Sequence, residues 1–182
     1  MSLLDSFENS EFPVAVYNDR ENSNRFRVGF VDAVSEKYFI LNRISYLGYE
    51  NGFLLGLVDD VFRVECNTMD INKDLLLWKL HGQTKSADIT PKDNLLTALF
   101  EAAESHNYII SINVFDEGIE PVEGFVSEFD DEQVVINNVD YCGNADGISL
   151  VALADIALII ANSYSQRILK ELYFAKLGAG GV

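Results

Sequence analysis

Apolar and polar positions follow the same order in two segments of the chain, residues 29–61 and 124–156. The segments align without a gap at an offset of 95 residues, and ten positions are identical over residues 29–67, including Gly29 and Gly124. A period of this length is too long for the repeat unit of a solenoid. The pattern therefore predicts a duplicated domain.

Within each repeat the periodicity predicts a helix, five short strands and a second helix. Expected strand segments in the first repeat are residues 12–17, 25–34, 37–46 and 53–65, the last of them holding two strands; their counterparts are 108–115, 120–129, 132–141 and 149–161. Expected helices are residues 2–10 and 69–80 in the first repeat, and 90–107 and 163–177 in the second. We place the domain boundaries at 1–87 and 88–182, with residues 81–88 as the linker.

One segment is ambiguous by its composition alone. Residues 149–161 are rich in Ala and Leu and are compatible with a helix, whereas the counterpart at 53–65 contains glycine and valine and favours a strand. The repeat therefore predicts strands in both, split at Asp60 and Asp155. An Asp before a strand commonly accepts backbone N–H bonds in a turn, so we expect a structural role for both; the alternative is that they line a shared site.

Glycines at matched positions predict local geometry. Gly29 and Gly124 lie within predicted strands, where glycine indicates a sharp bend or a bulge. The dipeptides Asn51-Gly52 and Asp146-Gly147 predict hairpin turns, because such turns need a positive φ.

Five bent antiparallel strands with a mid-strand glycine predict a small barrel, which closes its own edges. Residues 124–139 (GFVSEFDDEQVVINNV) resemble the first motif of the Sm-like family, with a glycine in a bent strand, spaced hydrophobic residues, an acidic position and an alternating strand. Residues 29–44 are similar to it. The resemblance implies a mainly β fold with helices (β+α), made of two duplicated five-stranded Sm-like small barrels, each flanked by helices.

The family's RNA-binding residues do not carry over to this sequence. Sm proteins place an Asp and then an Asn around one loop, but the position after Asp130 that the Asn would take holds Val134. In the first repeat Ser35 stands where Asp130 stands. The family's Arg-Gly pair is replaced by VDDV and LADI. The resemblance thus implies a fold and does not imply RNA binding.

The net charge of −16 is unevenly distributed over the 182 residues. The second repeat has no Lys or Arg between Lys92 and Arg167, whereas 14 acidic residues lie there. Such a surface repels phosphate, which makes nucleic acid an unfavourable partner. A candidate basic interaction face remains in the first repeat: Arg20, Arg25, Arg27, Lys37, Arg43 and Arg63. The alternative is that these charges are solvated and serve solubility.

No pattern for catalysis, a metal or a cofactor is found in the sequence. The two histidines, His81 and His106, have no metal-ligand spacing and no accompanying nucleophile motif. Cys66 and Cys142 are not at equivalent positions, which favours a reducing compartment over a disulfide framework. No export or membrane segment is evident, so we expect a cytoplasmic protein.

The sequence therefore predicts a non-catalytic binding or assembly module, with another protein as the expected partner and a monomer or homodimer as the expected state. Two alternatives stay open. The first is an Sm-like RNA-binding protein that uses the basic face of the first barrel. The second is a small-molecule sensor or an enzyme with a site at the junction of the barrels.

Overall fold

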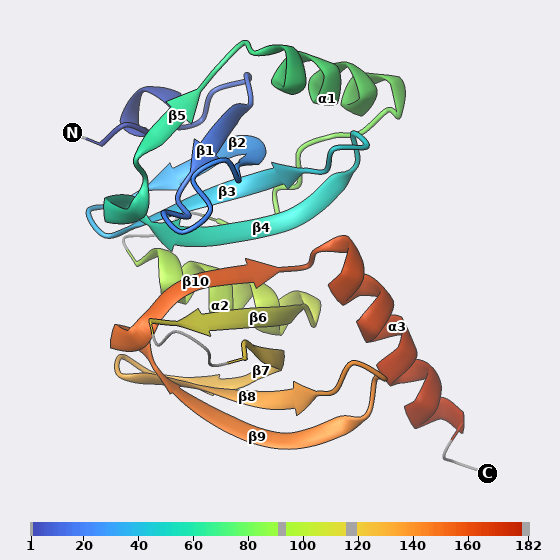
Figure 1. Ribbon diagram of the computed structural model, residues 1–182. Helices are drawn as coiled ribbons and strands as arrows, with labels where there is room; N and C mark the ends of the chain where they lie inside the picture. Colours follow the sequence, from blue (N-terminus) through green and yellow to red (C-terminus); the bar gives the residue numbers. More distant parts are fainter. Residues whose placement is uncertain (1, 91–93, 116–119, 180–182) are drawn as a thin grey trace. The chain divides into compact units, whose positions relative to one another are not determined.

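The computed structural model describes residues 2–90, 94–115 and 120–179 (Figure 1). The chain divides into two compact units, Met1–Ala98 and Leu99–Val182. Strands dominate both units and are accompanied by helices, so the chain is mainly β with helices. The division falls within a helix, whereas the sequence analysis places the boundary between residues 87 and 88.

The first unit is a five-stranded antiparallel sheet with the order β5-β1-β2-β3-β4. Its elements are η1 (Asp5–Phe7), β1 (Val14–Tyr17), β2 (Arg27–Val34), β3 (Tyr38–Ile44), β4 (Glu50–Leu57), η2 (Val58–Asp60), β5 (Arg63–Glu65) and α1 (Met69–Leu80).

The second unit repeats this topology with the order β10-β6-β7-β8-β9. Its elements are α2 (Leu95–His106), β6 (Ile109–Val114), β7 (Val122–Phe129), β8 (Gln133–Val139), β9 (Ala145–Ala152), η3 (Leu153–Asp155), β10 (Ile156–Ala161) and α3 (Tyr164–Ala179). β4 and β9, the strands at one end of the two orders, are both visibly curved (Figure 1).

Irregularities of the two sheets also match at the offset of 95 residues. The register shifts between β2 and β3 at Val31/Ala33, and between β7 and β8 at Val126/Glu128. Asn67 and Asn162, which precede the last helix of each unit, both have a positive φ, of 58° and 55°. The register shifts and the positive φ values repeat as well as the hydrophobic pattern. The two units therefore share details of backbone conformation.

Aromatic pairs hold the last helix of each unit against its sheet. In the first unit the ring of Trp78 on α1 lies 5.8 Å from the ring of Phe30, within a cluster that includes Ala15 and Ile71. In the second unit the ring of Tyr173 on α3 lies 5.1 Å from that of Phe125, which is the counterpart of Phe30. The equivalent helix aromatics thus serve as core residues.

The strand prediction for residues 149–161 is confirmed, because this segment forms β9, η3 and β10 with the break at Asp155. Helix α3 begins with a capping box: the Ser163 N–H donates to Gln166 Oε1 at 2.8 Å, and the Gln166 N–H donates to Ser163 Oγ at 3.4 Å. The expected helical start at Thr90 is wrong, since α2 is capped by the side chain of Asn94.

The predicted positions of the two hairpin turns are wrong. Gly52 and Gly147 have positive φ values, of 68° and 80°, but they lie inside β4 and β9. The chain reverses earlier, at Gly48 and Gly143, whose φ values are 74° and 79°. A hairpin turn needs a residue with a positive φ, and each repeat has two glycines that meet this need, so the sequence alone did not show which of them forms the turn.

Side-chain acceptors at the start of the turn decide which glycine forms the reversal. In the second unit Asp140 Oδ1 accepts from the N–H groups of Cys142 and Asn144, at 2.9 and 2.8 Å. In the first unit Ser45 Oγ accepts from the N–H of Tyr49 at 3.1 Å. These bonds close the reversal before the chain reaches the later glycine.

Gly29 and Gly124 allow a close approach between neighbouring strands. A Cβ at Gly29 would lie 2.4 Å from the backbone oxygen of Asn42, and one at Gly124 would lie 2.1 Å from that of Asn137. Only glycine, which has no Cβ, leaves room for the neighbouring strand at these two positions. The order of each sheet ends at two different strands, so closure into a barrel is not confirmed.

Candidate functional site

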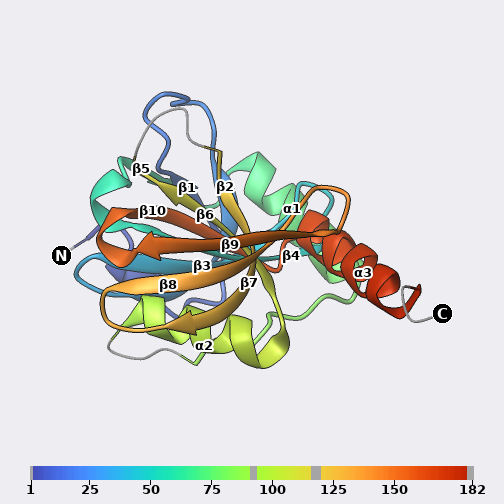
Figure 2. The same ribbon diagram turned by 90° about the horizontal axis from the view of Figure 1, so that it is seen from below.

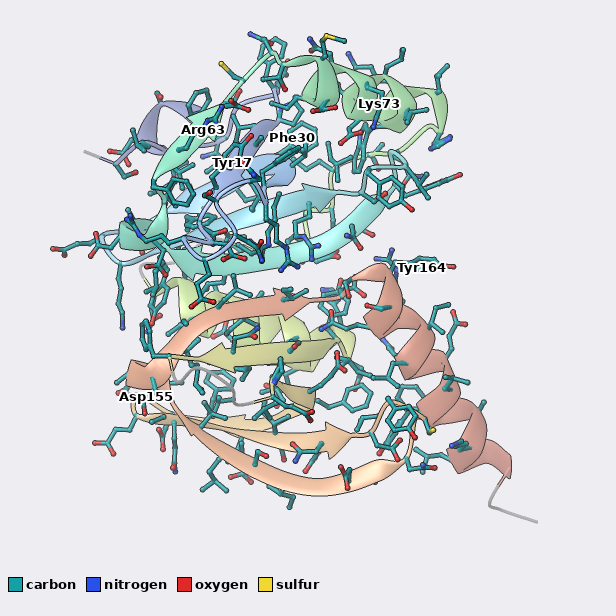
Figure 3. The ribbon with its side chains drawn as sticks, in the orientation of Figure 1. Tyr17, Phe30, Arg63, Lys73, Asp155 and Tyr164 are labelled. Carbon is teal, nitrogen blue, oxygen red and sulfur yellow. The ribbon has the colours of Figure 1, made fainter. Side chains whose placement is uncertain are left out.

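The six predicted basic residues do not form a single face. Arg63 and Arg20 lie against aromatic rings: Arg63 Cζ is 4.7 Å from the centroid of the Tyr17 ring, and Arg20 Cζ is 5.6 Å from that of Phe62 (Figure 3). Arg63 is also paired with Glu65. Lys37 stands apart from them, with its Nζ 4.9 Å from the Tyr38 ring. These three cations have contacts that account for their positions.

Strand register brings Arg27 and Arg43 to the opposite face of the same sheet. Arg27 pairs with Val16, the neighbour of Tyr17, so its side chain leaves the sheet on the face away from Tyr17. Arg43 on β3 pairs with Gly29. Gly29 lies two residues after Arg27 on β2 and therefore on the same face of the sheet. The two arginines are therefore diagonal neighbours on adjacent strands, a separation of about 7–8 Å that long side chains span.

Arg25, just before β2, completes a cluster of three arginines. Burial, together with the positive charges of Arg27 and Arg25, lowers the pKa of Arg43 to about 10. Burial also lowers the pKa of Arg27, and Arg25 adds to this effect. The Nη1 atom of Arg43 is buried and has no hydrogen-bond partner among the described residues.

Acidic residues compensate this cluster only in part. Asp19 lies 3.7 Å from Arg25, and Glu50 raises the pKa of Arg43. Both carboxylates also accept backbone N–H groups, Asp19 from Asn22 at 3.0 Å and Glu50 from Gly52 at 2.7 Å. Arg27 donates from Nη1 to Asn18 Oδ1 at 2.7 Å. Asp19 and Glu50, the carboxylates that these contacts bring to the three arginines, are thus already partly engaged by backbone N–H groups.

An ion pair in the first unit, which the sequence does not indicate, joins the exposed Lys85 to the buried Asp32. Lys85 Nζ lies 2.6 Å from the Oδ1 atom of Asp32 and 5.8 Å from the Phe30 ring. Next to it Asn42 donates to the backbone oxygen of Ser86 at 2.8 Å. Burial raises the pKa of Asp32, and Lys85 offsets part of this effect. Because these contacts attach the expected linker to β2 and β3, we assign them a structural role.

The two repeated acids occupy equivalent turns. Asp60 ends η2 and Asp155 ends η3 (Figure 3). Backbone bonds from Val61 to Val58 and from Ile156 to Leu153 close these turns. Burial raises the pKa of Asp60. Asp155 directly precedes β10, whereas Val61 and Phe62 separate Asp60 from β5. The structural role of both acids stays a prediction.

The second unit exposes apolar side chains on β9. Ile148 and Leu150 are each 64% exposed, whereas the equivalent residues of β4, Phe53 and Leu55, are 0% exposed. β9 ends the strand order of its unit. The fold thus presents large hydrophobic residues at the edge strand of one sheet.

Exposed residues of α3 extend this apolar surface. Ile148 pairs with Asn137, which pairs with Phe125, so all three lie on one face of the sheet. On that face the Phe125 ring lies 5.9 Å from the ring of Phe174 on α3, a helix that projects beyond the strands (Figure 2). We define the β9 surface as the following exposed residues: Ile148, Leu150, Ile168, Leu172, Phe174 and Leu177.

The histidines and cysteines of the described residues lie apart from the β9 surface and the arginine cluster in the sequence, and have the following surroundings. No group of three or more His, Cys, Asp or Glu side chains there is arranged for a metal ion. His81 stacks on Tyr49 at 4.2 Å and His106 on Tyr108 at 5.2 Å. Cys66 and Cys142 are free and exposed. No helix among the described residues has both the length and the apolar character needed to cross a membrane.

Comparisons of this chain with models of known families, with curated proteins and with solved structures found no match.

Proposed function

We propose that this chain is a cytoplasmic, non-catalytic binding module, built from two Sm-like small-barrel units, that engages another protein through the β9 surface. The shared strand order of the two units supports the fold, together with the close strand contacts at Gly29 and Gly124. The free, exposed cysteines agree with a reducing compartment.

The exposure of large apolar side chains on β9, which ends the strand order, carries the proposal. A curved edge strand with large exposed hydrophobic residues is a site for pairing with another chain unless charge or a cover blocks it. In the first unit the same positions are fully buried, while Ile148 and Leu150 are mostly exposed. Large exposed apolar side chains gathered on a strand and a helix of one unit favour interaction with another protein.

Charge along strand β9 indicates the chemistry of the partner segment that pairs with it, whereas α3 itself carries Arg167, Lys170 and Lys176. Asp146 lies two residues before Ile148 on the same strand, and Glu128 shares a row of the sheet with Val135 and Leu150. Acidic residues around an apolar strip favour a partner segment that is apolar and flanked by Lys or Arg. An extended segment of this composition would add to the free edge of β9.

Nucleic acid is a weaker candidate for this surface. The second repeat carries 16 acidic and 4 basic residues over positions 88–182, and counterion release needs cations. We therefore propose a protein partner, and a monomer or at most a homodimer for the chain alone.

A double substitution tests the proposal. We expect Ile148→Thr with Leu150→Thr to abolish co-purification of the partner from cells that naturally contain this chain, because threonine keeps the strand preference and removes the apolar contact. The partner, identified by mass spectrometry, should contain an apolar segment flanked by basic residues.

Met69→Gln is the matched control, since Met69 is 89% exposed on α1 of the other unit and should leave the partner bound. Retention of the same partner by the double variant would contradict the proposal. Light scattering gives a second contradicting outcome: a dimer of the unsubstituted chain that is absent in the double variant. The surface would then serve self-association.

A further inference from the structure

We propose that Arg25, Arg27 and Arg43 form a binding site for a small phosphate-type oxoanion in the first unit. It is separate from the β9 surface and does not depend on the proposed protein partner.

Like charges are brought together here by the strand register. Arg27 and Arg43 lie on one face of β2 and β3, and Gly29 between them in the ladder has no side chain that would separate them. Arg25 acts electrostatically on both. Folding therefore holds three guanidinium groups close together despite their mutual repulsion, an arrangement that an anion of high charge density would stabilise.

A buried donor without a partner is the second observation. Arg43 Nη1 is enclosed by the fold and donates to no described protein atom. Leaving such a charged donor unsatisfied is costly, and an anion bound by the accessible guanidinium nitrogens of the cluster would offset part of this cost through its charge. A phosphate oxygen accepts from guanidinium groups in a charge-assisted geometry.

None of the three arginines is present in the second repeat. The counterparts of Arg25, Arg27 and Arg43 at the offset of 95 are Glu120, Val122 and Asn138. The fold of the repeat therefore does not require these arginines. This comparison also supplies a substitution, Arg43→Asn, that the same position of the fold already accommodates.

Other basic residues of this unit serve as controls. Arg63 lies over the Tyr17 ring and is paired with Glu65, on the face of the sheet away from the cluster. We expect Arg63→Gln to leave oxoanion binding unchanged. Arg25, whose side chain is 63% exposed, supplies a second cluster variant, Arg25→Gln, that carries little risk to folding.

Isothermal titration calorimetry of the full chain with inorganic phosphate, at constant ionic strength, tests the site. We expect saturable binding to the unsubstituted chain and to Arg63→Gln. Arg43→Asn should bind phosphate about 10- to 100-fold more weakly, as expected for loss of a hydrogen bond to a charged group. Arg25→Gln should show a smaller loss, in the same direction.

Thermal unfolding in phosphate-free buffer adds a readout that a purely structural arginine would not give. Arg43→Asn should melt at a higher temperature than the unsubstituted chain, because a buried positive charge facing two others has been removed. Its melting temperature should no longer rise when phosphate is added.

Separate titrations with a nucleoside monophosphate and with uridine-rich RNA identify the source of the phosphate group. Tighter binding of the monophosphate than of free phosphate assigns the site to a phosphate ester; the reverse assigns it to the free ion. Equal responses of Arg43→Asn and the unsubstituted chain would overturn the proposal. Binding of the RNA without binding of either small phosphate would also overturn it.

Discussion

Two glycines at matched positions, Gly48 and Gly143, are required both by backbone conformation and by space. Each has a positive φ, and a Cβ would lie 2.3 Å from that of Leu77 or 2.8 Å from that of Leu172, on the last helix of its unit. Each turn therefore contacts a helix directly through its backbone. This contact explains why glycine occurs twice at this position.

Gly143→Ala and Gly147→Ala separate the two requirements. Both glycines have similar φ values, but a Cβ at Gly147 would meet nothing within 4 Å. We expect Gly147→Ala to cost about 1 kcal/mol of unfolding free energy, the usual penalty for this conformation. Gly143→Ala should cost at least twice as much, because α3 must also shift. Urea denaturation followed by circular dichroism measures both, and equal losses would show that α3 does not constrain the turn.

The sequence predicted the strands, but it did not predict which side chains share a face of a sheet. The repeat resolved residues 149–161 as strands, because one ambiguous copy could be interpreted from its partner. The arginine cluster was predicted only as part of a larger basic face, since strand register decides which of six cations share a side. Exposure of Ile148 and Leu150 gave no signal, because their counterparts Phe53 and Leu55 are equally apolar but buried.

At the scale of elements, the start of α3 joins the helix to its sheet. Gln166 closes the capping box with Ser163, donates to the backbone oxygen of Ile160 at 3.0 Å and contacts Glu123 on β7. Burial raises the pKa of Glu123 above its usual value of 4.5, and the hydrogen bond from Gln166 offsets part of this effect. The folded state thus favours protonated Glu123.

Glu123→Gln should therefore change the pH dependence of stability. A raised carboxyl pKa gives stability that is present below 4.5 and is lost as the pH rises through the folded-state pKa. We expect Glu123→Gln to become more stable relative to the unsubstituted chain between pH 4 and pH 7, by less than about 1 kcal/mol because the site is partly exposed. Urea denaturation at several pH values measures this. A difference that does not change with pH would contradict the assignment.

At the scale of the whole molecule, one fold has been used twice with different surface chemistry. Both units share strand order, register shifts and helix anchoring. The first unit carries the arginine cluster, whereas the second is strongly acidic and exposes the β9 surface. We interpret this as a division of binding roles after duplication, with an oxoanion site in one repeat and a protein-binding edge in the other.

Photo-crosslinking from position 150 tests the proposed function most directly. A benzoylphenylalanine in place of Leu150, in cells that naturally contain the chain, should crosslink to one protein within an apolar segment flanked by Lys or Arg. The same group in place of Met69 should not capture that protein. No crosslink from position 150, or crosslinks only to a second copy of the chain, would contradict the assignment of β9 as the site of a protein partner.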